Sequence, residues 1–116
     1  MMEYKKHFNP FMTKMSEVLD GKISDAYFSK FKEELDAKMV RGFEEHGDGV
    51  FSKDLSSILE EITFEALDLT GWSVIANFIA KKDFDQDSEI GKEILDIAAN
   101  GILNWVKIKA LQEKLK

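Results

Sequence analysis

The 116-residue sequence predicts an all-α protein, and three observations carry this prediction. Apolar residues recur at intervals of three and four along most of the chain, as they do on one side of a helix. No stretch shows the sustained apolar–polar alternation of a half-buried strand. The chain contains one proline, so long helices can run without interruption. We expect a single domain over residues 1–116, a four-helix bundle of antiparallel neighbours with a long C-terminal helix.

Each expected helix has a recognisable start or end. Asn9-Pro10 is typical of a helix N-terminus, and Gly21 ends that first helix. Ser24 and Ser88 are suitable N-caps for the second and fourth helices, and two glycines in HGDGVFSKD separate the second from the third. The predicted helices cover about 10–20, 25–46, 54–82 and 88–114.

The fourth helix repeats apolar residues in alternating steps of four and three, which is a heptad pattern. The positions are Ile90, Ile94, Ile97, Gly101, Asn104, Ile108, Leu111 and Leu115. Such a helix of about 27 residues would extend roughly 40 Å. We therefore expect a partner subunit to cover part of it, in a homo-oligomer that is a dimer or a tetramer. An ordinary long core helix would show the same periodicity.

Composition excludes several classes of function. The net charge of −6 argues against free nucleic acid as a partner, because phosphate binding requires a basic patch. There is no cysteine and there are two histidines, which excludes thiolate chemistry and a histidine-rich metal centre. No 18-residue apolar run or signal-peptide core is present, so we expect no membrane partner and a cytoplasmic location.

The third helix carries acids among residues that otherwise resemble a core. Ile58, Ile62, Leu69 and Ala76 form its main apolar stripe. Beside that stripe lie Glu61, Glu65, Asp68 and Trp72. Because this helix has almost no polar side, we expect the three acids to be partly buried. Like charges at these spacings repel one another and require a counter-charge.

The second helix offers cations on a strip of its own, formed by Glu34, Lys38, Arg41 and Glu45. If the two helices pack antiparallel, the strips face each other. Two interpretations follow. In a structural one, Lys38 and Arg41 neutralise the acids in an ion network. In a functional one, the carboxylates hold Mg²⁺, with Mn²⁺ as an alternative, and the two cations bind phosphate oxygens.

The segment from Arg41 to Trp72 contains RGFEEHGD, followed by ILEEITFEALDLTGW. It resembles the all-α NTP pyrophosphohydrolases, the MazG-like and dimeric dUTPase-like superfamily, in its small phage and bacterial members. The resemblance extends over about residues 28–79 and includes the E-xx-D motif at Glu65 and Asp68. The first acidic motif departs from the family, because Arg41 replaces its leading carboxylate. Glu34 or Glu61 could take that place; otherwise the chain would bind nucleotide without cleaving it.

The resemblance implies hydrolysis of a nucleoside triphosphate to the monophosphate and pyrophosphate. It assigns Glu45, Glu61, Glu65 and Asp68 to Mg²⁺, with Glu61 or Glu65 acting on the attacking water. Lys38 and Arg41 would hold the polyphosphate and Trp72 would stack on a base, although an aromatic residue at this spacing is more often part of a core. The alternative function is a non-catalytic acidic helical protein, phage-borne, that inhibits a protein partner.

Overall fold

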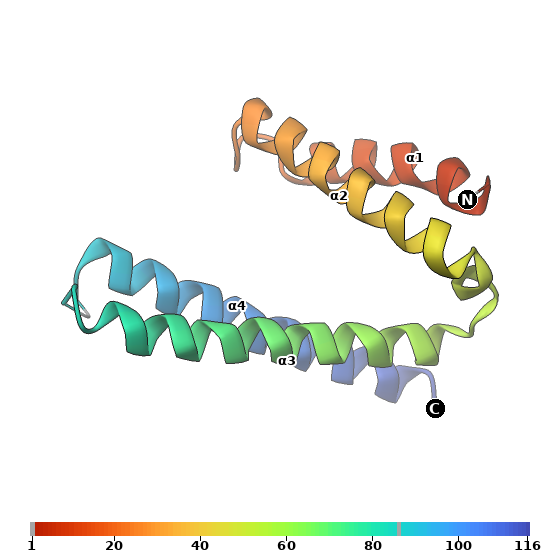
Figure 1. Cartoon of the computed structure of the whole chain (residues 1–116). Helices are drawn as coiled ribbons and strands as arrows, with labels where there is room; N and C mark the ends of the chain where they lie inside the picture. The colour runs from red at the N-terminus through yellow and green to blue at the C-terminus, as the bar shows by residue number, and fades with distance from the viewer. Residues whose placement is uncertain (1, 86) are drawn as a thin grey trace. The chain divides into compact units, whose positions relative to one another are not determined.

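The computed structural model describes residues 2–85 and 87–116, and the fold prediction of an all-α protein is confirmed. The described residues contain no strand. Each of two compact units, residues 1–53 and 54–116, is a pair of helices that run side by side in opposite directions (Figure 1). The elements are α1 (Met2–Val18), α2 (Asp25–His46), the 3₁₀ turn η1 (Gly49–Ser52), α3 (Leu55–Ala80) and α4 (Glu89–Lys114).

Helix α1 begins at Met2 instead of at the predicted Pro10, which lies in its interior. Proline lacks the N–H that would bond to the carbonyl four residues earlier, so this position weakens the helix. The helix continues because its residues at intervals of four pack on α2. Tyr4 and Met12 are buried and Phe8 is half-buried. The packing of this apolar stripe outweighs the local preference of proline for a helix start.

Helix α2 has the predicted range, and both of its ends are capped. The Ser24 side chain accepts a hydrogen bond from the Tyr27 N–H at 3.2 Å, and Gly47 follows the last turn with φ of 75°. That backbone conformation suits glycine. The turn η1 then places Phe51 5.6 Å from the Phe43 ring and 5.9 Å from the His7 ring, measured between centroids. These aromatic contacts close the α1–α2 unit.

Helices α3 and α4 are both N-capped and form the second unit. Asp54 accepts a hydrogen bond from the Ser57 N–H at 2.8 Å, and Ser88 accepts one from the Gly91 N–H at 3.1 Å. The α3 side chains at the contact follow a heptad spacing, and so do those of α4. The seam consists of Leu59, Thr63, Ala66, Thr70, Ser73, Asn77 and Ala80 of α3 against Gly91, Ile94, Ala98, Gly101, Trp105, Ile108 and Gln112 of α4.

Small residues dominate this seam, so the two backbones come close together. The hydroxyl groups of Thr63, Thr70 and Ser73 donate to the carbonyls of Leu59, Ala66 and Leu69 at 3.0, 2.9 and 2.8 Å. Because each buried hydroxyl is satisfied within its own helix, it does not incur the cost of an unpaired polar group.

Many large apolar residues of the predicted stripes lie outside the seam. Within the predicted α4 heptad, Gly101 and Ile108 are buried and Ile94 is half-buried, whereas Ile90, Ile97, Asn104, Leu111 and Leu115 are exposed. On α3, Ile58 is half-buried, and Ile62, Leu69 and Ala76 are exposed. The predicted stripes consist of large apolar side chains, but the contact between α3 and α4 is centred on small side chains, which allow the two backbones to approach closely.

Among the described residues, no helix is long and apolar enough to cross a membrane.

Candidate functional site

The acidic strip of α3, defined as Glu61, Glu65 and Asp68, lies on the side of the helix that faces away from α4. At 100° per residue, Glu61 is about half a turn from the seam residue Leu59, and Asp68 is equally far from Ala66. All three acids are exposed, so the expected partial burial is not found in the α3–α4 unit. Trp72, one turn beyond Asp68, is 70% exposed and is not a core residue of this unit.

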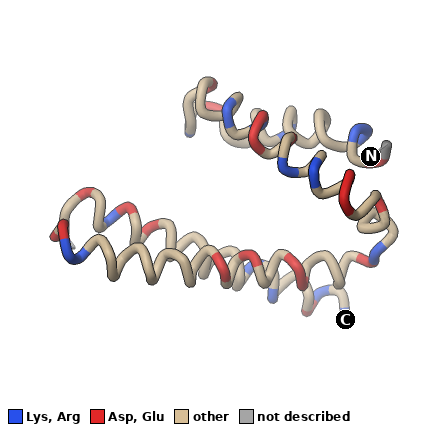
Figure 2. The backbone as a smooth tube through the Cα atoms, viewed as in Figure 1, with Lys and Arg blue, Asp and Glu red and all other residues tan. Residues whose placement is uncertain are grey.

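Within the described part of the α3–α4 unit, these three carboxylates make no hydrogen bond or ion pair with a side chain. Glu60 provides the contrast, because its carboxylate accepts a hydrogen bond from Gln112 Nε2 at 2.8 Å and lies 4.0 Å from Lys109 Nζ. Red bands mark the acids along the first half of α3 in Figure 2, whereas the second half, from Leu69 to Ala80, is uncharged. No described side chain of this unit thus neutralises the charge of the strip.

Carboxylates at these spacings suit a hard divalent cation. Residues three and four apart are neighbours on a helix surface, so adjacent acids of the strip can share one ion. In the structure as described, no three Asp, Glu or His side chains already converge closely enough to hold a metal. A Mg²⁺ ion keeps several waters and substrate oxygens as ligands, so it does not require a complete set of protein ligands.

The remaining predicted site residues lie on α2, in the other unit. Lys38, Arg41 and Glu45 follow one another at intervals of three and four, so they share one side of that helix, and all are exposed. Glu45 Oε2 lies 3.6 Å from the His46 Nε2 atom. Glu34, one turn before Lys38, is exposed as well. The structure thus groups the predicted residues into two sets, one on α2 and one on α3.

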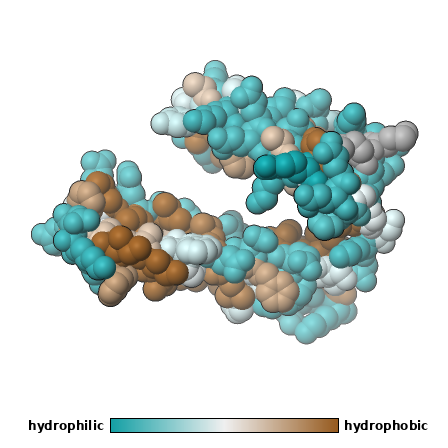
Figure 3. Space-filling view, viewed as in Figure 1, coloured by the Kyte–Doolittle hydropathy of each residue, from teal (hydrophilic) through white to brown (hydrophobic). Residues whose placement is uncertain are grey.

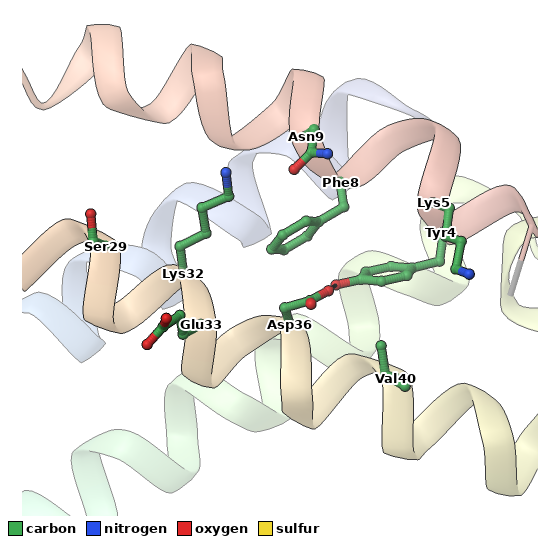
Figure 4. A pocket seen from close by; sticks show the side chains of 9 residues that line it. All are labelled: Tyr4, Lys5, Phe8, Asn9, Ser29, Lys32, Glu33, Asp36 and Val40. Atoms are coloured by element: carbon green, nitrogen blue, oxygen red, sulfur yellow. Dashed lines mark hydrogen bonds between the residues drawn. The ribbon is translucent and has the colours of Figure 1, made fainter.

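The α1–α2 unit also contains a hollow of about 580 Å³ that the sequence patterns do not indicate. Figure 4 shows nine side chains around it, with Tyr4 and Phe8 reaching in from α1 and Asp36 from α2. The Tyr4 hydroxyl donates a hydrogen bond to the Asp36 carboxylate at 2.5 Å. The Tyr4 ring is packed between Phe8 and Phe43, with centroids 5.1 and 5.0 Å away.

Burial of the ring raises the pKa of Tyr4 well above its ordinary value of 10.0, and the hydrogen bond and the charge of Asp36 act in the same direction. A neutral tyrosine is the form that donates to a carboxylate, so this contact holds Tyr4 protonated. Sequence reasoning missed the residue because it began the first helix at Pro10. The spacing of Tyr4, Phe8 and Met12 was the signal that could have identified it.

Comparison of the chain with protein-family models, with curated proteins and with solved structures gave no match.

Proposed function

We propose that the protein hydrolyses a nucleoside triphosphate to the monophosphate and pyrophosphate, with Mg²⁺ as cofactor. The observation that supports this proposal is the acidic strip of α3, in which three exposed carboxylates share one side of one helix and have no ion-pair partner among the described residues. The strip includes the E-xx-D motif at Glu65 and Asp68 that resembles the MazG-like pyrophosphohydrolases. A divalent cation held by the strip would offset the repulsion between these carboxylates and a triphosphate.

The chain contributes binding and orientation to this reaction. Glu61, Glu65 and Asp68 would hold Mg²⁺, and Glu61 or Glu65 would orient the water that attacks the α-phosphorus. The bond from that phosphorus to the bridging oxygen breaks, and pyrophosphate leaves. When bound, the metal lowers the pKa of water and offsets charge on the phosphate oxygens. The exposed indole of Trp72, one turn away, is available to stack on a base.

Lys38, Arg41 and Glu45 stay predictions for this site, with Lys38 and Arg41 binding the polyphosphate and Glu45 the metal. Their exposure on one side of α2 is compatible with those roles. Arginine suits phosphate recognition because its guanidinium can donate two parallel hydrogen bonds.

The test is pyrophosphate release from ribo- and deoxyribonucleoside triphosphates, in Mg²⁺ and separately in Mn²⁺. Glu65→Gln should reduce the rate by at least a hundredfold, because it removes a carboxylate ligand but keeps the side-chain shape. Glu60→Gln is the matched control on the same helix, since Glu60 points to α4 residues and not to the strip. It should retain most of the activity. Equal rates in the two variants would contradict the proposed role of the strip.

A second candidate function is that of a non-catalytic protein that binds and inhibits a protein partner. The observation in its favour is the set of large apolar side chains exposed along α3 and α4, among them Phe78 at 65% and Leu103 at 57% exposure. Absence of pyrophosphate release with every nucleotide and both metals would favour this function over the enzyme.

A further inference from the structure

The hollow between α1 and α2 combines aromatic side chains with charged ones, and all of its lining residues belong to one unit. Its volume of about 580 Å³ lies within the range of small-molecule sites. Hydrophilic residues cover most of this unit on the side drawn in Figure 3. Figure 4 shows Phe8 at the centre of the hollow, with Tyr4 on one side of it and Lys32 on the other. The hollow thus places an apolar surface next to a cation.

Lys32 is a half-buried cation without a counter-charge. Its side chain extends from α2 toward α1 (Figure 4). In the described part of the unit, its ammonium group makes no ion pair or hydrogen bond with another side chain. A partly desolvated charge is unfavourable unless an opposite charge or hydrogen-bond acceptors compensate it. An anion bound from solution would supply that compensation.

The acid best placed to pair with Lys32 is engaged elsewhere. Asp36 follows Lys32 by four residues, the spacing at which a lysine and an acid on one helix can pair. Instead, the Asp36 carboxylate accepts the hydrogen bond of the Tyr4 hydroxyl at 2.5 Å. Because the Phe8 and Phe43 rings pack against Tyr4, the hydroxyl keeps Asp36 on the Tyr4 side of the hollow, away from Lys32 (Figure 4).

The chemistry of the lining favours a ligand that joins an aromatic ring to one carboxylate. The half-buried Phe8 ring offers a face or edge against which a second ring can pack. A carboxylate can accept hydrogen bonds from the Lys32 ammonium group and from the neutral donors of Asn9 and Ser29, which also line the hollow. A cationic ligand would be repelled by Lys5 and Lys32, and the two acids of the lining disfavour a doubly charged phosphate.

We propose that the hollow between α1 and α2 binds a small aromatic carboxylate, whose ring packs on Phe8 and whose anionic group pairs with Lys32. Tyr4 is a positioning residue of this site, because its hydrogen bond to Asp36 keeps that acid from neutralising the ammonium group. The site is separate from the proposed nucleotide site. At 100° per residue, Asp36 and Lys38 are about half a turn apart, so the hollow and the predicted phosphate-binding residues lie on opposite sides of α2.

The test is an NMR titration of the intact chain with 2-naphthoate, in which the amide resonances report both affinity and location. The dissociation constant should be below about 1 mM, and the largest shifts should fall in residues 4–9 and 29–36. The neutral analogue 2-naphthamide has nearly the same shape and should bind about tenfold more weakly, because it cannot form the ion pair. Inorganic phosphate should also bind more weakly than 2-naphthoate, since it lacks the ring.

Two lysine replacements on α2 test the anionic contact. Lys32→Met removes the charge and should weaken the binding of 2-naphthoate about tenfold, to the level of the amide. Lys30→Met is the matched control, because Lys30 is exposed on the same helix and does not line the hollow. It should leave the dissociation constant unchanged.

A rescue experiment tests the role of Tyr4. Tyr4→Phe keeps the ring but releases Asp36 to pair with Lys32, so it should weaken the binding of 2-naphthoate about threefold. The double variant Tyr4→Phe with Asp36→Asn should restore binding, because it removes the competing acid, whereas a loss of packing would not be restored in this way. Equal affinity for 2-naphthoate and 2-naphthamide, equal effects of the two lysine replacements, or no binding at several millimolar 2-naphthoate would overturn the proposal.

Discussion

The Gly101 backbone of α4 lies directly against the Thr70 side chain of α3. A Cβ atom at position 101 would overlap Thr70 Oγ1 and would lie 3.4 Å from the Ala66 carbonyl oxygen. Thr70 cannot simply turn away, because its hydroxyl donates to that same carbonyl at 2.9 Å. The absence of a side chain at Gly101 is thus what allows the two helices of this unit to come together.

The variant Gly101→Ala should destabilise the α3–α4 unit by about 1–3 kcal/mol, because the added methyl group overpacks the seam. Gly71→Ala is the matched control on α3, where a Cβ atom has nothing within 4 Å. It should stabilise the protein by about 0.5–1 kcal/mol through helix propensity. Urea unfolding followed by far-UV circular dichroism measures the change in unfolding free energy of both variants. The double variant Gly101→Ala with Thr70→Ala should recover part of the stability that Gly101→Ala loses. Equal effects of the two glycine replacements would contradict the close contact.

The pH dependence of stability should reveal the Tyr4–Asp36 contact. Because the folded pKa of Tyr4 is raised, its contribution is fully present below the unfolded value of 10.0. Above that pH the unfolded state loses its tyrosine proton first, so the contribution falls as pH rises toward the folded pKa. Wild type and Tyr4→Phe should differ in unfolding free energy by about 1 kcal/mol at pH 8, and the difference should shrink from pH 10 to pH 11. A constant difference would show that Tyr4 titrates normally.

Helix α3 should depend on the charge of its N-cap. The Ser57 backbone N–H donates to Asp54 and holds the pKa of that carboxyl below its ordinary value of 3.8. Its contribution to stability is present above that value and is lost as pH falls through the folded pKa. Asp54→Ala should therefore lower the thermal midpoint at pH 7 and have a smaller effect at pH 2.5. If Asp54→Ala lowered the thermal midpoint equally at both pH values, the loss of stability would not come from the charge of the carboxylate.

The sequence predicts the helical class and most helix ends correctly, because caps such as Ser24 and Ser88 act locally. It fails where tertiary packing overrides a local signal. Pro10 lies inside α1 because Tyr4 and Met12 pack on α2, and the α3–α4 seam selects Gly101, Thr70 and Ala66 over larger residues nearby. Periodicity identifies which residues share a side of a helix, but it does not say which side meets a neighbour.

The same limit applies to the candidate site. The spacing of Glu61, Glu65 and Asp68 predicts that they share one side of α3, which the structure shows. It does not predict that this side faces solvent, because the apolar residues around the acids suggested a buried helix.

Manganese binding should locate the cation site. Paramagnetic Mn²⁺ at low concentration should broaden the amide resonances of Glu61, Glu65 and Asp68 first, because adjacent carboxylates compete best for the ion. Excess Mg²⁺ should reverse the broadening. The acidic turn at Asp83 and Asp85 is an internal comparison, since its acids are also exposed. Preferential broadening there would argue against the acidic strip as the metal site.

The proposed hydrolysis can be tested by identifying the reaction products with ³¹P NMR. At least one nucleoside triphosphate with Mg²⁺ should yield the monophosphate and pyrophosphate in equal amounts. The Glu65→Gln variant should give neither product signal, and Glu60→Gln should give both. Formation of a diphosphate and free phosphate, or an unchanged triphosphate spectrum across all nucleotides and both metals, would rule out the proposed pyrophosphohydrolase activity.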